Sequence, residues 1–168
     1  MRRFSVLLIA MICLSSCGTS KKARVVTKKE RTSRVSTTSS NPQANAIIKT
    51  ATSYKGVRYK FGGTTKKGMD CSGLVVTSFK SENIQLPRTT SELSKFGDWI
   101  DLKKVSEGDL LFFATRKNSR KVNHVGIVTK VHKDTVEFIH ASTSKGVITS
   151  LLSERYWYFA FVQARRVL

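Results

Sequence analysis

The order of the hydrophobic patterns constrains the fold of this chain more than any other feature. In residues 44–54 and again in 71–82, apolar side chains recur at the spacing of a helix. From residue 105 onward, short β-rich runs alternate with turns, and the clearest runs are 110–113, 123–131 and 135–140. Helices followed by successive strands predict an α+β domain, with N-terminal helices packed on one mainly antiparallel β-sheet.

Local signals place the individual elements. Asp70 and Thr89 are good N-cap residues, so we expect helices over 71–82 and from 90 towards 96. The alternating segment 57–61 predicts a short strand or an extended segment. Near the C-terminus we expect a single helical turn over 151–156, followed by an aromatic-rich strand over 157–167.

The N-terminus has the pattern of an export signal. Arg2 and Arg3 precede the apolar run 4–14, which is too short for a membrane span because a spanning helix needs about 20 residues. The following Leu-Ser-Ser-Cys resembles the bacterial lipobox, which implies cleavage before Cys17 and acyl chains on its sulfur. An ordinary signal peptide with a chance cysteine is the alternative.

The chain therefore divides into three parts. Residues 1–16 are the predicted lipoprotein signal peptide, and residues 17–43 are a lipidated, basic and flexible tether, since this stretch has no aromatic residue and only Glu30 as an acid. Residues 44–168 form the predicted folded domain. Gly18, in place of an aspartate, favours transport to the outer membrane, so we expect a lipid-anchored protein of the cell envelope that faces the periplasm.

The strong positive charge limits the kinds of partner that the protein is expected to bind. The formal net charge is +19, and loss of Arg2 and Arg3 with the signal leaves +17. Nucleic acid is the usual partner of such a charge, but an exported lipoprotein seldom meets it, so we expect none. An anionic wall polymer or membrane surface fits the compartment better.

One cysteine is left over once the N-terminus is accounted for. Cys13 leaves with the signal and Cys17 carries lipid, so Cys71 has no partner for a disulfide. It follows a glycine-rich turn, and Asp70 as N-cap places it in the first turn of a helix. The backbone N–H groups there favour a thiolate and are expected to lower the pKa of the thiol. The alternative is a buried small hydrophobe.

Two histidines share one face of a predicted hairpin. A three-residue loop over 131–133 places His124 opposite His140, and a five-residue loop makes them diagonal neighbours. An even-length loop would put them on opposite faces of the sheet. Gly126 leaves room beside the rings, and His132, in the turn itself, is given no role.

A cysteine with two histidines supplies what thiol catalysis needs. We expect His124 to hold the Cys71 thiolate as an ion pair and to protonate the leaving amine, while His140 orients the ring of His124. Zinc is the rival, but it needs a third or fourth ligand, and none lies at ligand spacing. We therefore expect no metal and no cofactor. Alternatively, His140 has only a structural role, as a histidine at a strand end whose ring nitrogens are hydrogen-bonded within the fold.

Six short motifs in the same order resemble the NlpC family of papain-like cell-wall endopeptidases. The resemblance covers residue 44 to the end. The motifs are Tyr59-Lys60-Phe61-Gly62-Gly63, Asp70-Cys71-Ser72-Gly73-Leu74, Leu86-Pro87-Arg88-Thr89, Gly108-Asp109-Leu110-Leu111-Phe112-Phe113, His124-Val125-Gly126-Ile127 and His140-Ala141-Ser142.

The resemblance implies a catalytic triad of Cys71, His124 and His140. Tyr59 matches the family's active-site tyrosine, and with Ser72 and Asp70 it is expected to bind the substrate or its oxyanion. The implied substrate is peptidoglycan. The implied reaction is hydrolysis of an amide bond in the stem peptides or crosslinks through a thioester intermediate. We expect the protein to be a monomer. The lipobox, the tether and a histidine as third residue resemble the Spr type of murein endopeptidase lipoprotein.

Two points leave alternatives open. Members of the family often carry glutamine a few residues after the Arg-Thr pair, where this chain has Leu93 and Ser94, so substrate details transfer less well. The rival functions are a non-catalytic lipoprotein that binds the wall through its tether and basic loop, and a thiol amidase or acyltransferase with another substrate. The basic loop contains Arg116, Lys117, Arg120 and Lys121.

Overall fold

The computed structural model describes residues 41–133 and 135–168. The predicted signal peptide, the predicted lipidation site Cys17 and nearly all of the predicted tether lie outside these residues. Within them, no helix combines the length and the apolar character that crossing a bilayer requires.

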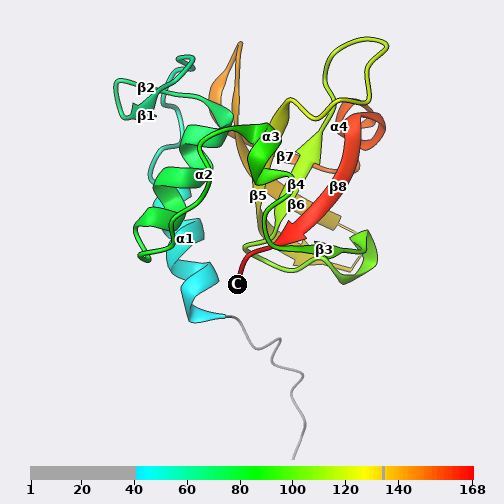
Figure 1. Ribbon diagram of the computed structural model, residues 1–168, viewed down its shortest axis with the longest axis horizontal. Helices are drawn as coiled ribbons and strands as arrows, with labels where there is room; N and C mark the ends of the chain where they lie inside the picture. The colour runs from blue at the N-terminus through cyan, green and yellow to red at the C-terminus, as the bar shows by residue number, and fades with distance from the viewer. Residues whose placement is uncertain (1–40, 134) are drawn as a thin grey trace, which may run out of the picture. The chain divides into compact units, whose positions relative to one another are not determined.

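A six-stranded antiparallel sheet forms the centre of the domain (Figure 1). Its order, from one edge to the other, is β3-β8-β4-β5-β6-β7. A separate two-stranded ribbon, β1-β2, precedes the second helix. The strands are β1 Thr64–Thr65, β2 Gly68–Met69, β3 Asp98–Ile100, β4 Leu110–Phe113, β5 His124–His132, β6 Thr135–Ser142, β7 Gly146–Leu151 and β8 Phe161–Arg166.

The longer helices lie on one side of this sheet (Figure 1). The helical elements are α1 Pro42–Thr52, α2 Cys71–Lys80, α3 Thr90–Leu93, the 3-10 turn η1 Leu102–Lys104 and α4 Arg155–Ala160. The chain therefore has the α+β fold that its pattern predicts. The first helix begins at Pro42, two residues before the predicted domain start, because Asn41 caps it by accepting a hydrogen bond from the Gln43 N–H at 3.0 Å.

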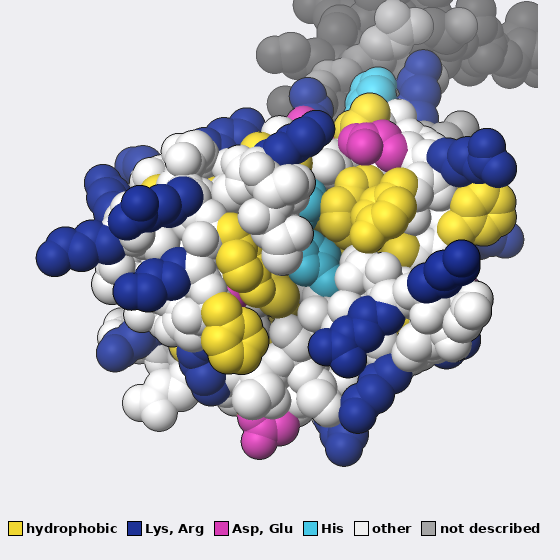
Figure 2. All heavy atoms as spheres, turned by 90° about the horizontal axis from the view of Figure 1, so that it is seen from above, with side chains coloured by type: hydrophobic (Ala, Val, Ile, Leu, Met, Phe, Trp, Pro, Cys, Tyr) yellow, Lys and Arg dark blue, Asp and Glu magenta, His cyan; other side chains and the backbone are white. Residues whose placement is uncertain are grey.

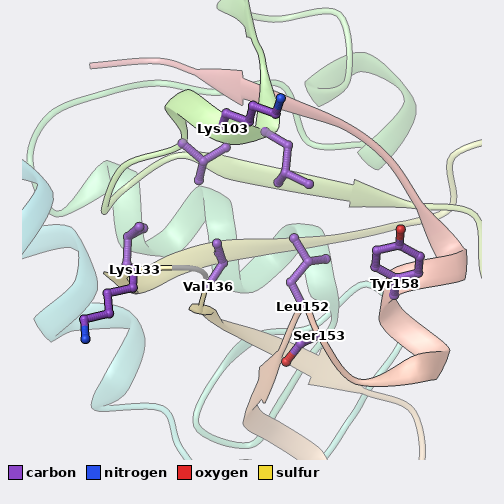
Figure 3. Close-up of a pocket in the computed structure, with 9 residues that line it drawn as sticks. Lys103, Lys133, Val136, Leu152, Ser153 and Tyr158 are labelled. Atoms are coloured by element: carbon purple, nitrogen blue, oxygen red, sulfur yellow. The ribbon is translucent and has the colours of Figure 1, made fainter.

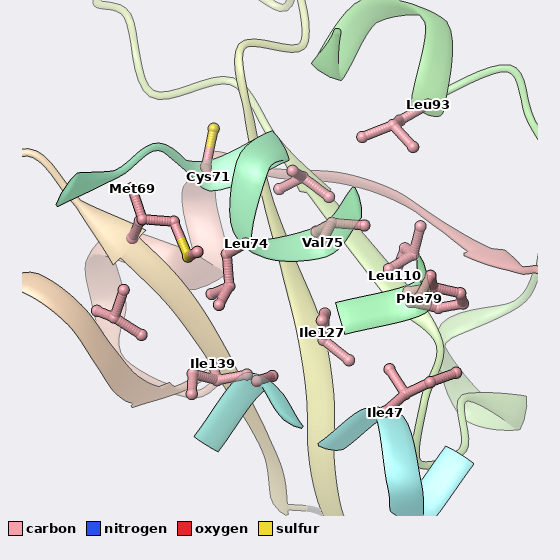
Figure 4. Packing of buried hydrophobic residues seen from close by; sticks show 14 of the residues in the cluster. Ile47, Met69, Cys71, Leu74, Val75, Phe79, Leu93, Leu110, Ile127 and Ile139 are labelled. Carbon is pink, nitrogen blue, oxygen red and sulfur yellow. The ribbon is translucent and has the colours of Figure 1, made fainter. Parts of the chain in front are cut away.

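Both faces of the sheet are covered. On one face, Ile47 of α1 and Leu74 and Phe79 of α2 pack against Ile127 and other strand residues (Figure 4). On the other face, a second apolar cluster joins alternate strand residues to α4, and it includes Leu111, Phe113, Val128, Phe138, Trp157 and Ala160. The double cover explains why β4 is an unbroken apolar run, since all four of its residues are buried.

The predicted C-terminal strand over 157–167 is wrong in its first part. Trp157 and Ala160 belong to α4, and the strand begins only at Phe161. The aromatic residues favour a strand by local propensity, but Trp157 instead packs its ring against Phe113, with ring centroids 5.0 Å apart. Of the two alternatives for 57–61, the structure shows no strand but an isolated bridge from Tyr59 to Met69. The sequence pattern did not predict β3.

The hairpin between β5 and β6 brings the two histidines together by an unexpected register. His132 pairs with Thr135, so two residues connect the strands, and an even-length loop alone would separate the histidines. A register shift between Val128 and Lys130 restores the parity, and Val128 pairs with Phe138. Continued along the strands, this register makes His124 and His140 diagonal neighbours.

Candidate active site

The start of α2 is fixed by Asp70. Its Oδ1 accepts the N–H of Gly73 at 2.6 Å, as an N-cap does, and its Oδ2 accepts the N–H of Gly62 at 2.7 Å. Arg88 donates to both carboxylate oxygens, at 3.1 and 2.9 Å, and to Ser72 Oγ at 2.7 Å. The glycine-rich turn, the helix start and Arg88 are thereby joined through a single carboxylate.

These partners keep Asp70 ionised. Burial alone would raise its pKa, but the hydrogen bonds from Arg88, Gly73 and Gly62 outweigh burial and hold the pKa below its ordinary value. The Asp70 carboxylate is therefore fully engaged inside the protein, and the guanidinium of Arg88 is held at the surface of the site.

Cys71 lies in the first turn of α2 and is 7% exposed. Its sulfur points away from the apolar cluster under the helix (Figure 4). It opens into a hollow of about 400 Å³ that Tyr59, Phe61, Ser72, Arg88, Thr90 and Asn123 also line. The thiol is thus accessible from one side, although most of its surface is covered.

The net effect on the thiol pKa is opposite to the prediction from the helix start. Burial raises the pKa of Cys71, and this outweighs the hydrogen bonds from Thr90 and from the backbone N–H groups of Val125 and Ser72, which lower it. The Thr90 Oγ1 atom lies 3.6 Å from the sulfur. The contact with Val125 places the sulfur beside the first residue of β5, which is His124.

The two predicted histidines contact each other directly. His124 Nε2 lies 3.0 Å from His140 Nδ1, and the ring planes are nearly perpendicular at 82°. His140 is fully buried, and its Nε2 lies 3.2 Å from Ser150 Oγ on β7. Burial lowers the pKa of His124 to about 4, and burial together with the charge of His124 lowers that of His140 to about 3. Both rings are therefore neutral near pH 7.

Only one arrangement of protons leaves His124 able to act as a base. If His124 Nε2–H donates to His140 Nδ1, then His140 Nε2–H donates to Ser150 Oγ, and His124 Nδ1 is left with a free lone pair. The reverse arrangement satisfies the same contacts but protonates Nδ1. With its Nε2 engaged by His140, Nδ1 is the nitrogen of His124 that can take a proton from a thiol.

Trp157 covers the histidine pair. Its ring stacks on His124, with centroids 5.4 Å apart and an angle of 22°, and meets His140 edge-on at 4.6 Å. The indole thereby keeps water from the His124–His140 hydrogen bond, which is stronger in a dry environment. The aromatic segment from 155 thus serves the site as a helix, whereas the sequence pattern predicted a strand there.

Tyr59 stands at the same hollow as Cys71. Burial, and then the charges of Cys71 and Asp70, raise the pKa of its phenol. The hydroxyl therefore stays protonated and can donate a hydrogen bond to a group bound in the hollow.

The structure brings together all the predicted residues that it describes. Cys71, Tyr59, Ser72 and Asp70 line one hollow. His124 and His140 lie beside it. Sequence reasoning missed Thr90, Ser150 and Trp157, because their positions depend on contacts between elements that are distant along the chain. Thr90 had the best local signal, since it follows the N-cap Thr89.

Two other features of the described residues bear on the choice of site. No group of three or more His, Cys, Asp and Glu side chains at metal-binding distance occurs in 41–133 and 135–168. A second hollow, of about 390 Å³, lies between η1, the β5–β6 hairpin and α4 (Figure 3). Its lining includes Val136, Leu152 and Tyr158, and it contains none of the predicted site residues.

A cysteine in the first turn of a helix, next to a histidine pair on an antiparallel sheet, is the arrangement of the papain-like class of domains. The sequence model of the NlpC/P60 family matches residues 56–166. The chain belongs to this family.

Individual relatives agree with this assignment. The chain is 43% identical over 116 residues to the Murein DD-endopeptidase MepS/Murein LD-carboxypeptidase of Escherichia coli (strain K12), with 68% of this chain and 58% of that protein covered. It is also 43% identical over 116 residues to the Probable endopeptidase NlpC of the same strain, with 68% and 72% covered. The crystal structure of an NlpC/P60 family protein from Bacillus cereus ATCC 10987 superimposes with a TM-score of 0.67 at 30% identity, covering 73% of this chain and 39% of that one.

Proposed function

We propose that this protein is a peptidoglycan endopeptidase that hydrolyses an amide bond in the stem peptides or crosslinks of the bacterial wall. The observation that carries the proposal is the 3.0 Å contact between His124 and His140 beside a cysteine that opens into a hollow. The printed names of the relatives support the substrate class. The chain spans only 58% of the first of these relatives, so its activity is inferred from its own site.

In the proposed first step, Cys71 attacks the carbonyl carbon of the substrate. The thiol proton moves to His124 Nδ1 as the sulfur–carbon bond forms, because both groups are neutral at rest. Backbone N–H groups at the start of α2, with the Tyr59 hydroxyl, stabilise the oxyanion. His124 then gives its proton to the leaving amine, the carbon–nitrogen bond breaks, and a thioester remains on Cys71.

In the second step, water completes the hydrolysis. His124 takes a proton from the water as the water oxygen bonds to the thioester carbonyl carbon. The carbon–sulfur bond then breaks, His124 returns the proton to the Cys71 sulfur, and the acyl product leaves as a carboxylic acid. Throughout both steps, His140 holds the ring of His124 in one orientation. Asp70 acts by fixing Arg88, and Arg88 and Ser72 offer hydrogen bonds to the acyl part of the substrate.

The place of action follows from the predicted N-terminus. We propose that a lipid on Cys17 anchors a monomer to the outer membrane, and that the basic segment 17–43 lets the domain reach the wall from the periplasmic side. This part of the proposal rests on the sequence, since residues 1–40 lie outside the described residues. Palmitate labelling of the protein and of Cys17→Ser tests it, because label on both variants would contradict it.

Digestion of purified sacculi tests the catalytic proposal. Soluble muropeptides should appear with the purified protein and should be absent with Cys71→Ala, whose fold is checked by circular dichroism. Mass spectrometry of the products identifies the bond. Binding without release would identify a non-catalytic wall-binding protein, and release of products that retain every stem and crosslink amide would contradict an endopeptidase.

A further inference from the structure

A third hollow lies between the segment that follows β4 and the helix α4. It has a volume of about 560 Å³ and is lined by Ala114, Thr115, Arg155, Tyr156, Phe159 and Ala160. Tyr156 and Phe159 are mostly exposed there, at 58% and 67%. Exposed aromatic rings on both sides of a catalytic centre are a feature of a binding cleft rather than of a solvated surface. Figure 2 shows histidine side chains in the middle of this face, with hydrophobic side chains on either side and basic ones around them.

This hollow neighbours the one at Cys71. Asn123 lines the Cys71 hollow, and its amide exchanges hydrogen bonds of 2.8 Å with the N–H and the hydroxyl of Thr115, which lines the third hollow. Ring contacts link the third hollow to the histidine pair, because Tyr156 meets Trp157 at 4.8 Å and Trp157 stacks on His124. The third hollow therefore lies close to both Cys71 and His124.

The proposed mechanism gives the two parts different tasks. The acyl part of the substrate stays bound to the Cys71 sulfur and lies in the hollow of Tyr59 and Arg88. The leaving amine takes its proton from His124, so the residue that carries this amine must extend past His124 towards Trp157. The third hollow lies in that direction, because Tyr156, which lines it, contacts Trp157.

The charges of the third hollow point to the chemistry of that residue. Arg155 forms no ion pair within the described residues. The neighbouring carboxylate, Glu154, already accepts the N–H of Leu151 at 2.7 Å. The loop that follows Thr115 adds the exposed side chains of Arg116 and Lys117. A cationic hollow with aromatic walls suits a small residue with a free carboxylate.

We propose that Arg155 binds a free carboxylate on the amine-side residue of the cleaved bond, and that Tyr156 and Phe159 contact the body of that residue. This inference rests on the proposed function and names its preferred substrates, which are wall peptides whose amine-side residue at the cleaved bond carries a free carboxylate. Arg155 is then a specificity-determining residue that takes no part in the bond-breaking steps.

A pair of stem peptides that differ only in a carboxylate or carboxamide on the amine-side residue of the cleaved bond tests the proposal. The purified protein should cleave that bond with a higher kcat/KM for the acid. Arg155→Ala should lower kcat/KM for the acid by about tenfold, as expected for loss of one charge-assisted contact, and should leave the amide unchanged. Arg155→Lys should restore part of the preference. Lys80→Ala, at the opposite end of α2 from Cys71, should cleave both peptides like the unaltered protein.

The outcomes separate the two levels of inference. Equal cleavage of acid and amide by the unaltered protein, or an equal loss on both with Arg155→Ala, would overturn the role of Arg155 while leaving the endopeptidase intact. Failure to cleave either peptide, together with failure to release muropeptides from sacculi, would instead refute the proposed function.

Discussion

At the scale of single residues, the proposed nucleophile and base share one environment that disfavours charge on either of them. Burial raises the pKa of Cys71 and lowers that of His124 to about 4, so the pair rests as thiol and imidazole. Moving one proton between them creates two adjacent opposite charges, whose attraction offsets much of the cost of desolvation. The thiolate is therefore expected to form together with the imidazolium rather than ahead of it.

Thr90 contributes to this balance, because its hydroxyl is a hydrogen-bond partner of the sulfur at 3.6 Å. Thr90→Val keeps the shape of the side chain and removes that partner, so the pKa of Cys71 should rise further. Alkylation of Cys71 by iodoacetamide at pH 7.5 should slow about fivefold, for a hydrogen bond of about 1 kcal/mol. Thr52→Val, at the end of α1, is the control. An unchanged alkylation rate in Thr90→Val would exclude this role.

Ser150 is the hydrogen-bond partner of His140 Nε2–H in the proton arrangement that leaves His124 Nδ1 free. Ser150→Ala removes the acceptor of His140 Nε2–H, so kcat should fall about tenfold, while Ser150→Thr should restore it. Nitrogen NMR of the imidazoles should show a changed His140 tautomer in Ser150→Ala, which a merely structural role would not produce. Ser153→Ala is the matched control. A kcat for Ser150→Ala equal to that of the unaltered protein would contradict the arrangement.

The residues that sequence reasoning found are those with local or periodic signals. Asp70 and Cys71 follow from helix capping, and the shared face of His124 and His140 follows from alternation along strands. Ser150 and Thr90 have no comparable signal, because each contributes one hydroxyl across a tertiary contact. The direction of the Cys71 pKa shift could not be predicted from the sequence either, because it depends on how deeply the start of α2 is buried.

At the scale of elements, the β5–β6 hairpin determines the geometry of the site. The connection has two residues, and the shift between Val128 and Lys130 supplies the extra residue that returns both histidines to one face. The sequence predicted that the two histidines share a face only if the loop has an odd number of residues. They do share a face, but because of the register shift within the strands and not because of the loop length. A bulge is set by packing on neighbouring strands, which local patterns do not encode.

Gly126 lets β5 and β6 approach closely beside the histidines. A Cβ at this position would lie 2.6 Å from the buried ring of Phe138 and 3.3 Å from the Cβ of His140. Gly126→Ala should therefore destabilise the fold by about 1–3 kcal/mol and reduce kcat by displacing His140. Urea unfolding measures the first effect, with Thr135→Ala as the control in the same hairpin. An unchanged unfolding midpoint would show that the strands tolerate the added methyl.

α4 illustrates where local propensity fails. Trp157 and its aromatic neighbours favour a strand when read alone, but the second face of the sheet needs a cover. The short helix α4 places Trp157 over the histidine pair. It also places Tyr156 and Phe159 at the third hollow. In α4, which covers the site, burial against the sheet thus outweighs the local propensity of its aromatic residues for a strand.

At the scale of the whole molecule, the buried histidines make stability depend on pH. Their folded-state pKa values, about 4 and about 3, lie below the ordinary 6.5, so the unfolded chain binds protons that the folded chain does not. Stability is fully present above pH 6.5 and is lost as the pH falls from 6.5 towards 4. Each histidine contributes about 1.4 kcal/mol per pH unit in this window.

Urea unfolding between pH 7 and 4.5 measures this slope. His140→Asn should remove about half of the histidine contribution. A slope that is the same in His140→Asn as in the unaltered protein would show that His140 is not held neutral by the fold.

The central claim is that Cys71 and His124 act as one catalytic unit. Cleavage of a defined muropeptide by Cys71→Ala, His124→Ala and the double variant tests it most directly, since residues that act together lose their effect together. We predict that each single variant loses at least about a thousandfold in kcat, and that the double variant is no slower than the singles. Normal turnover by Cys71→Ala, or losses that multiply in the double variant, would contradict the account.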